Sequence, residues 1–164
     1  MIELMITVAI IGILAAITLP SFTSTIEQNR MRLAVDTIIG DFRQSESLAK
    51  AAGAGQSVAL EVSNPGASWS YTVTHSSSGA VLTRQANDFS GAVSLAVTGS
   101  DFSDADGDGD RDVTFSQLRL IDSSGTGTIV LTLNDISVEI SRNLVGMISA
   151  CSDNSGMGYP SCGN

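Results

Sequence analysis

The residues best suited to chemistry form one acidic segment, residues 101–112, which reads DFSDADGDGDRD. Six of its twelve residues are aspartates. Their mutual repulsion favours an open loop when no cation is present, whereas a hard cation such as Ca²⁺ takes carboxylate and carbonyl oxygens as ligands. The segment therefore predicts either a calcium-binding loop or a solvated acidic loop that aids solubility.

The spacing of the aspartates favours the calcium interpretation. An EF-type loop that starts at Asp104 has carboxylates at positions one, three, five and nine, a glycine at position six and a backbone carbonyl at position seven. These residues are, in the same order, Asp104, Asp106, Asp108, Asp112, Gly109 and Asp110. Phe115 stands at position twelve, where an EF-hand has a bidentate glutamate, so the sequence excludes a complete EF-hand and predicts an abbreviated Ca²⁺ loop.

Two cysteines near the C-terminus predict a small disulfide loop. Cys151 and Cys162 enclose ten residues that include two glycines and a proline. Closing a loop of this size stabilises a fold by about 3 kcal/mol, and a disulfide indicates an oxidising compartment outside the cytosol. Redox-active cysteines are more closely spaced, as in CxxC, so we expect a structural role.

Catalysis is not indicated. His75 is the only histidine, and it precedes three serines in a segment that a turn after a strand explains. The sequence has no nucleophile elbow, phosphate loop, zinc-ligand spacing or dinucleotide fingerprint. We expect that the protein is not an enzyme.

Length and charge restrict the remaining classes. The chain has 164 residues, which suffice for one globular domain and an appendage. Lys and Arg number 8 against 17 Asp and Glu, so the net charge is -9. This balance disfavours nucleic-acid binding, which depends on clustered cations.

The appendage is the apolar N-terminal run. Residues 2–19 contain one charge, Glu3, and residues 4–19 would form about 24 Å of helix, slightly less than the ~30 Å of a bilayer core. A cleaved secretory signal is a poor alternative, because such signals begin with Lys or Arg. A plain anchor gains nothing from Glu3, which is costly in lipid. We expect Glu3 to pair with the N-terminal ammonium of a neighbouring subunit and so to set the register of an assembly.

Residues 2–17, IELMITVAIIGILAAI, resemble the N-terminal helix of type IV pilins and type II secretion pseudopilins almost position for position. In that family a peptidase cuts after a glycine that precedes Phe-Thr-Leu-Ile-Glu, and the new terminal phenylalanine is N-methylated. The resemblance implies that Glu3 is the glutamate that docks each subunit into the growing filament. It also implies that Pro20 matches the proline after the apolar run, and that the helix between Gly12 and Pro20 is often melted in filaments.

The sequence departs from the family pattern at its first residue. Met1 stands where the family has leucine, and the Gly, Phe and Thr of the cleavage site are missing. We expect that the precursor begins upstream and that Met1 is a leucine codon read as a start.

Residues 21–52 predict an amphipathic helix, which Gly53 and Gly55 end. Its apolar stripe, with spacings of three, four or seven, is expected to pack against a sheet. The stripe consists of Met31, Val35, Ile38, Phe42, Ala49 and Ala52.

After this helix, short β-type runs alternate with turn signals. We expect strands at residues 57–62, 68–74, 80–84, 92–97, 113–120, 128–133, 136–141 and 145–150. A long helix on antiparallel strands gives an α+β fold, which the resemblance makes pilin-like. The chain then divides into an apolar membrane or filament-core helix (1–20), an amphipathic helix (21–53) and a β-rich globular domain with the disulfide loop (54–164).

Residues 35–60, in which SLAKAAGAGQ precedes the first strand, are similar to the helix-to-strand junction of H-type minor pseudopilins and of the FimT and FimU minor pilins. Part of that group takes up DNA through a basic Gly-Arg-x-Arg motif near the C-terminus. The comparable residues here, 146–149, read GMIS and lack both arginines. A DNA-uptake role is therefore disfavoured.

Taken with the resemblance, the sequence predicts a structural subunit of a type IV pilus-like extracellular filament, or fimbrium. The subunit would be a homo-oligomer in contact with other pilins, after a stage in the bacterial inner membrane. A minor pilin or pseudopilin that primes a pilus or a type II secretion system is an open alternative. A membrane-anchored adhesin or DNA-uptake receptor is a third.

Overall fold

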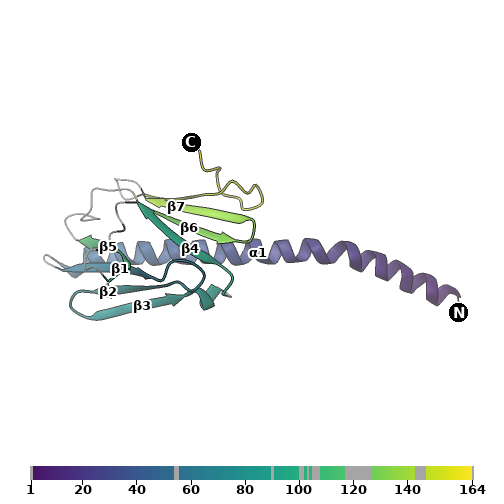
Figure 1. Ribbon diagram of the computed structural model, residues 1–164, viewed down its shortest axis with the longest axis horizontal. Coiled ribbons are helices and arrows are strands. Elements are labelled where there is room, and N and C mark those ends of the chain that lie inside the picture. The colour runs from purple at the N-terminus through teal and green to yellow at the C-terminus, as the bar shows by residue number, and fades with distance from the viewer. Residues whose placement is uncertain are drawn as a thin grey trace.

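The computed structural model describes residues 2–53, 56–89, 91–99, 102, 104, 108–116, 127–142 and 147–163, with their side chains except at 15–21 and 116. A single long helix carries two antiparallel sheets on its C-terminal half, and its N-terminal half extends away from them (Figure 1). The fold is therefore α+β, as the sequence predicts.

Helix α1 (Ile2–Ala52) has 51 residues, so it is about 76 Å long. It continues through both Gly12 and Pro20 without a break. The helix ends at Gly53, whose φ of 88° is a left-handed conformation that glycine adopts without steric cost. The predicted apolar and amphipathic segments are thus two parts of one helix. The melting of residues 12–20 is expected in a filament and stays a prediction.

Within the described residues, eight strands form two sheets. Their bounds are β1 (Ser57–Ser63), β2 (Ser70–His75), β3 (Gly79–Gln85), β4 (Ser94–Gly99), β5 (Arg111–Ser116), β6 (Gly127–Leu133), β7 (Ile136–Arg142) and β8 (Ile148–Cys151). Sheet A has the order β3-β2-β1-β5 and sheet B the order β4-β6-β7-β8, and every pairing is antiparallel. A strand lies at each predicted position, and the strand ends differ from the predicted ones by at most three residues, except at β5, whose predicted end at residue 120 lies outside the described residues.

The core lies between α1 and the inner faces of both sheets. Alternate residues of β1, β6 and β7 are buried, which is the two-residue period of a half-buried strand. From the helix, the predicted stripe is buried at Met31, Val35, Ile38, Phe42 and Ala49, whereas Ala52 is only half-buried. The stripe meets sheet A directly, since the Phe42 ring packs edge-on against Phe115 of β5 with centroids 6.0 Å apart.

A short 3-10 helix, η1 (Ala86–Phe89), follows β3 and was not predicted. Its Phe89 stacks on Trp69 at a centroid distance of 5.5 Å, and Trp69 in turn stacks on Tyr71 at 5.9 Å. Trp69 Nε1 donates a hydrogen bond to the Val93 carbonyl at 2.8 Å. The aromatic stack is therefore part of the core, and the indole nitrogen of Trp69 has a hydrogen-bond partner.

Candidate functional site

The N-terminal part of α1 exposes apolar side chains on all sides. Consecutive helical residues are about 100° apart, so a run of apolar residues covers the whole circumference. The large apolar residues between positions 2 and 14 are 52% to 74% exposed. They are Ile2, Leu4, Met5, Ile6, Val8, Ile10, Ile11, Ile13 and Leu14. A helix with one apolar stripe is covered by one partner, but this segment needs apolar surroundings on every side.

Glu3 is the only charged residue between positions 2 and 26. It is exposed in the first turn of α1, where the helix dipole favours a carboxylate. Gly12 lies in the same projecting segment, and among the described residues no atom outside the adjacent helix backbone lies within 4 Å of the position that a Cβ would take there. The side chain of Pro20 lies outside the described residues. Glu3 and Gly12 are thus both accessible to a second molecule.

Apolar exposure continues where the helix enters the domain. Phe22 and Leu33 are 69% and 60% exposed, and Ile26 is partly exposed. Within the described residues, no helix is both long enough and apolar enough to cross a membrane.

The acidic segment lies next to sheet A at residues 108–112, and its described aspartates have different local roles. Asp104 Oδ2 accepts a hydrogen bond from the Gly109 amide at 3.2 Å, and Asp108 Oδ1 accepts one from the Asp110 amide at 2.9 Å. Asp112 lies inside β5, where it pairs with Glu61 of β1. Asp106 lies outside the described residues.

A strand follows the acidic segment, whereas a helix follows the loop of an EF-hand. Phe115, at the position of the missing bidentate ligand, is fully buried in the core. Both observations agree with the exclusion of a complete EF-hand.

Glu61, on β1, is an acidic neighbour of this segment that the sequence did not reveal. Carboxylate oxygens of Glu61, Asp108 and Asp110 lie within 4.8 Å of one another. Ser63 Oγ, two residues along β1, donates a hydrogen bond to Asp110 Oδ2 at 2.5 Å. Burial raises the pKa of Glu61, and the charges of Asp112, Asp110 and Asp108 raise it further. The three clustered carboxylates are oxygen ligands of the kind that Ca²⁺ prefers.

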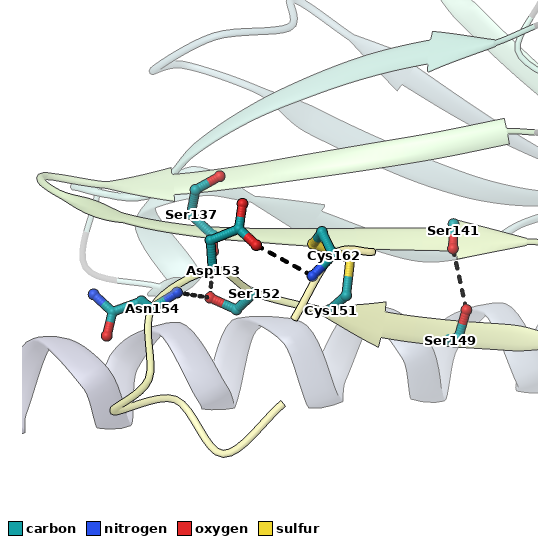
Figure 2. The surroundings of a disulfide bond; sticks show 8 residues. All are labelled: Ser137, Ser141, Ser149, Cys151, Ser152, Asp153, Asn154 and Cys162. Carbon is teal, nitrogen blue, oxygen red and sulfur yellow. Dashed lines mark hydrogen bonds between the residues drawn. A yellow bond between two sulfur atoms is a disulfide. The ribbon is translucent and has the colours of Figure 1, made fainter. Parts of the chain in front are cut away.

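The predicted disulfide is present. Cys151 at the end of β8 is bonded to Cys162, with an S–S distance of 2.09 Å and a Cα–Cα distance of 4.9 Å. Ser152 Oγ donates to the Ser137 carbonyl at 2.6 Å and accepts from the Asn154 amide at 3.2 Å, and Asp153 Oδ1 accepts from the Cys162 amide at 3.2 Å (Figure 2). The loop is therefore tied to β7 by one hydrogen bond and to β8 by the disulfide, and two further hydrogen bonds lie within the loop region.

The disulfide loop, residues 152–161, also docks on α1. Arg32 donates hydrogen bonds from Nη2 to the Gly156 carbonyl at 2.8 Å and from Nε to the Met157 carbonyl at 3.2 Å. The Met157 side chain is 2% exposed and belongs to the main core. Asn134, in the turn between β6 and β7, donates to Glu27 Oε1 at 2.8 Å. These contacts hold sheet B against α1 close to the point where the helix leaves the domain.

Two further polar contacts join α1 to the sheets, and sequence reasoning did not find either of them. Asp41 accepts hydrogen bonds from Tyr71 Oη at 2.6 Å and from Arg84 Nε at 3.0 Å. On the other side, Arg142 of β7 pairs with Glu46 at 3.1 Å, and its guanidinium lies over the Phe115 ring. Because they pair the buried Asp41 and the half-buried Glu46 of α1 with groups on the strands, both contacts fix the helix relative to the sheets.

His75 is the last residue of β2, immediately before the turn to β3. Its Nδ1 is 3.0 Å from Ser77 Oγ and accepts a hydrogen bond from the Ser77 amide at 3.2 Å. The contact joins residues two positions apart, which is typical of a turn.

No family model matches the chain, and neither the curated proteins nor the solved structures contain a significant match to it.

Proposed function

We propose that this chain is a structural subunit of a type IV pilus-like extracellular filament that assembles through its N-terminal helices. The observation that supports this proposal most is the all-round apolar exposure of α1 between residues 2 and 14. Such a segment is stable when apolar groups surround it, as in a bilayer or a bundle of like helices. Before assembly it holds the subunit at the bacterial inner membrane, and in the filament it lies in the core among other copies and other pilins.

Glu3 is the proposed assembly residue. A carboxylate that enters an apolar bundle costs several kcal/mol, and the helix dipole returns only about 0.3 to 1 kcal/mol of this. A cation from a neighbour is therefore required, and the N-terminal ammonium of the adjacent subunit has the right charge and position along parallel helices. Pairing the two groups fixes the axial register, and a head-to-tail contact of this kind generates an open helical filament.

Gly12 and Pro20 are the proposed points of local melting in the filament. Glycine weakens a helix interior, and proline removes one backbone donor. The segment between them then adapts to its neighbours while the C-terminal half of α1 stays packed on the sheets.

We also propose that the acidic segment binds Ca²⁺. The ligand set expected from the sequence, Asp104 to Asp112, gains Glu61 from β1, whose carboxylate lies close to those of Asp108 and Asp110. A bound divalent cation would offset the repulsion among these groups and hold the segment against sheet A. Sites of extracellular modules bind Ca²⁺ with dissociation constants of about 10⁻⁴ to 10⁻³ M, so an incomplete ligand set is sufficient outside the cell.

The filament proposal is tested by expressing the full chain in cells that carry a type IV pilus assembly machinery. We expect the wild-type chain to appear in sheared filaments that electron microscopy resolves, and the Glu3→Gln chain to stay in the membrane fraction. The matched control is Asp88→Asn, which removes one exposed carboxylate charge of η1 and keeps an acceptor for the Gln85 amide. This control should assemble as the wild type does.

Two results would contradict the proposal. One is a wild-type chain that never leaves the membrane fraction, and the other is a Glu3→Gln chain that assembles at the wild-type level. The abundance of the chain in sheared filaments then distinguishes a major subunit from a minor pilin or pseudopilin. A dominant gel band indicates the first role, and a trace indicates the second.

A further inference from the structure

A hollow of about 260 Å³ opens beside the disulfide on sheet B. Three of its lining side chains are acidic and, among the described residues that line it, none is basic. The lining consists of Asp135, Ser137, Glu139, Asp153, Asn154 and Cys162. Cys162 is half-buried, so the hollow is a route by which a small molecule reaches its sulfur.

The carboxylates lie close to the sulfur atoms. Glu139 of β7 pairs directly with Cys151 of β8, and a Glu139 carboxylate oxygen and both Sγ atoms lie within 4.8 Å of one another. Asp153 is held beside Cys162 by the hydrogen bond from the Cys162 amide to its Oδ1 (Figure 2). Two carboxylates, those of Glu139 and Asp153, therefore lie beside the disulfide.

A disulfide is opened by a thiolate anion. The attacking sulfur forms a mixed disulfide with Cys162 Sγ, the bond between the two cysteines breaks, and Cys151 leaves as a thiolate. A second thiolate then attacks the mixed disulfide and forms a disulfide with the first small molecule. Cys162 is released as a thiolate, so the cysteine pair has gained two electrons in total. The attacking thiolates and the leaving Cys151 thiolate are all close to the negative charges of Glu139 and Asp153.

We propose that the carboxylates of the acidic hollow slow thiol–disulfide exchange at Cys151–Cys162 by electrostatic repulsion. Each carboxylate repels the incoming thiolate and destabilises the thiolate that leaves. Slower exchange preserves the disulfide, so the disulfide loop stays closed on α1 with Met157 in the core and Arg32 bound to the loop carbonyls. This role depends on the disulfide and its neighbours alone, so it does not rest on the filament proposal.

The test compares two thiols of different charge on the full chain in a non-ionic detergent. Glutathione carries net negative charge, whereas the thiolate of cysteamine also carries an ammonium group. At neutral pH and low salt, we expect Glu139→Gln to raise the rate constant for reduction by glutathione roughly fivefold, the effect of one unit charge at about 4 Å in water. Asp153→Asn, which keeps an acceptor for the Cys162 amide, should act in the same direction. The rate with cysteamine should rise less, because its ammonium group offsets the repulsion of the incoming thiolate and only the effect on the leaving thiolate remains.

Salt and a distant charge provide the controls. The difference between wild type and Glu139→Gln should shrink towards zero in about 1 M salt, where the screening length is about 3 Å. Asp88→Asn removes one negative charge, as Glu139→Gln does, but it lies outside the hollow. It should leave both rates unchanged. Reduced protein is measured by intact mass after acid quenching and alkylation.

Two outcomes would overturn this proposal. Equal glutathione rates for wild type and both variants at low salt would show that the carboxylates do not affect attack. An equal increase with glutathione and cysteamine would show that the substitutions merely loosen the loop.

Discussion

Tyr71 of β2 donates a 2.6 Å hydrogen bond from its phenolic oxygen to Oδ2 of Asp41 on α1, inside the boundary between the helix and sheet A. Asp41 is only 6% exposed, and Arg84 of β3 approaches the same carboxylate from its more exposed side. Burial raises the pKa of Tyr71, and the Asp41 charge raises it further, so the phenol remains a donor at physiological pH. The helix is thus joined to two neighbouring strands through one carboxylate.

We predict that Tyr71→Phe lowers the free energy of unfolding by about 1 to 3 kcal/mol, because it removes a donor from a buried carboxylate and leaves the ring in place. The measurement is urea unfolding of the full chain in a non-ionic detergent, followed by Trp69 fluorescence. Thr72→Val is the matched control, since the Thr72 hydroxyl shares an exposed hydrogen bond with the Thr83 hydroxyl at 3.3 Å. A loss below about 0.5 kcal/mol for Tyr71→Phe would contradict the assigned role of this contact.

Met157 tests whether the disulfide loop is part of the core. We predict that Met157→Ala lowers the free energy of unfolding by about 2 to 5 kcal/mol, because a buried side chain is removed and a cavity remains. Met147, which is 67% exposed, provides a control with the same chemistry, and Met147→Ala should change stability by less than about 0.5 kcal/mol. Equal effects of the two substitutions in urea unfolding would show that the loop does not dock on α1.

Local sequence patterns predicted most of the elements because each pattern is set by nearby residues. The apolar spacing of Met31, Val35, Ile38 and Phe42 marks the buried side of α1, and this side is observed. Asn134 was predicted as a turn residue, and with a φ of 51° it adopts the left-handed conformation that the turn between β6 and β7 requires. The disulfide was predictable because only two cysteines exist and they lie close together in the sequence.

Contacts between distant residues were not predictable from these patterns. Glu61 and Asp112 pair because β5 adds to the edge of β1, and no local signal states which strands become neighbours. For the same reason, the spacing of the aspartates suggested a self-contained loop, whereas the structure adds a carboxylate from β1. Arg32 and Gly156 are separated by 124 positions, and their hydrogen bond depends on how sheet B packs on the helix.

Glu61 gives the cation-free protein a specific pH dependence. Its pKa is raised above the ordinary value of 4.5, so folding favours the protonated carboxyl group. Protonation of Glu61 contributes its full stabilisation below the pKa that Glu61 has in the unfolded chain. This contribution is lost as the pH rises through the higher pKa that Glu61 has in the folded protein. We therefore predict that, without Ca²⁺, Glu61→Gln raises the free energy of unfolding at neutral pH by up to about 1 kcal/mol and has no such effect at acidic pH. Urea unfolding at both pH values measures this, and a Glu61→Gln protein that is less stable at neutral pH would contradict it.

Calcium should reverse that preference, because a divalent cation makes the ionised form of Glu61 the favoured one. We predict that calorimetric titration of the full chain shows Ca²⁺ binding with a dissociation constant of about 10⁻⁴ to 10⁻³ M and that saturating Ca²⁺ raises the melting temperature. Asp108→Asn and Glu61→Gln should each weaken binding by about tenfold or more, since each removes one anionic ligand. Asp135→Asn removes an exposed carboxylate outside the acidic segment and should bind Ca²⁺ as the wild type does. Absence of both binding heat and thermal stabilisation in the wild type would exclude the calcium site, and weakening by Asp108→Asn but not by Glu61→Gln would confine the ligands to residues 104–112.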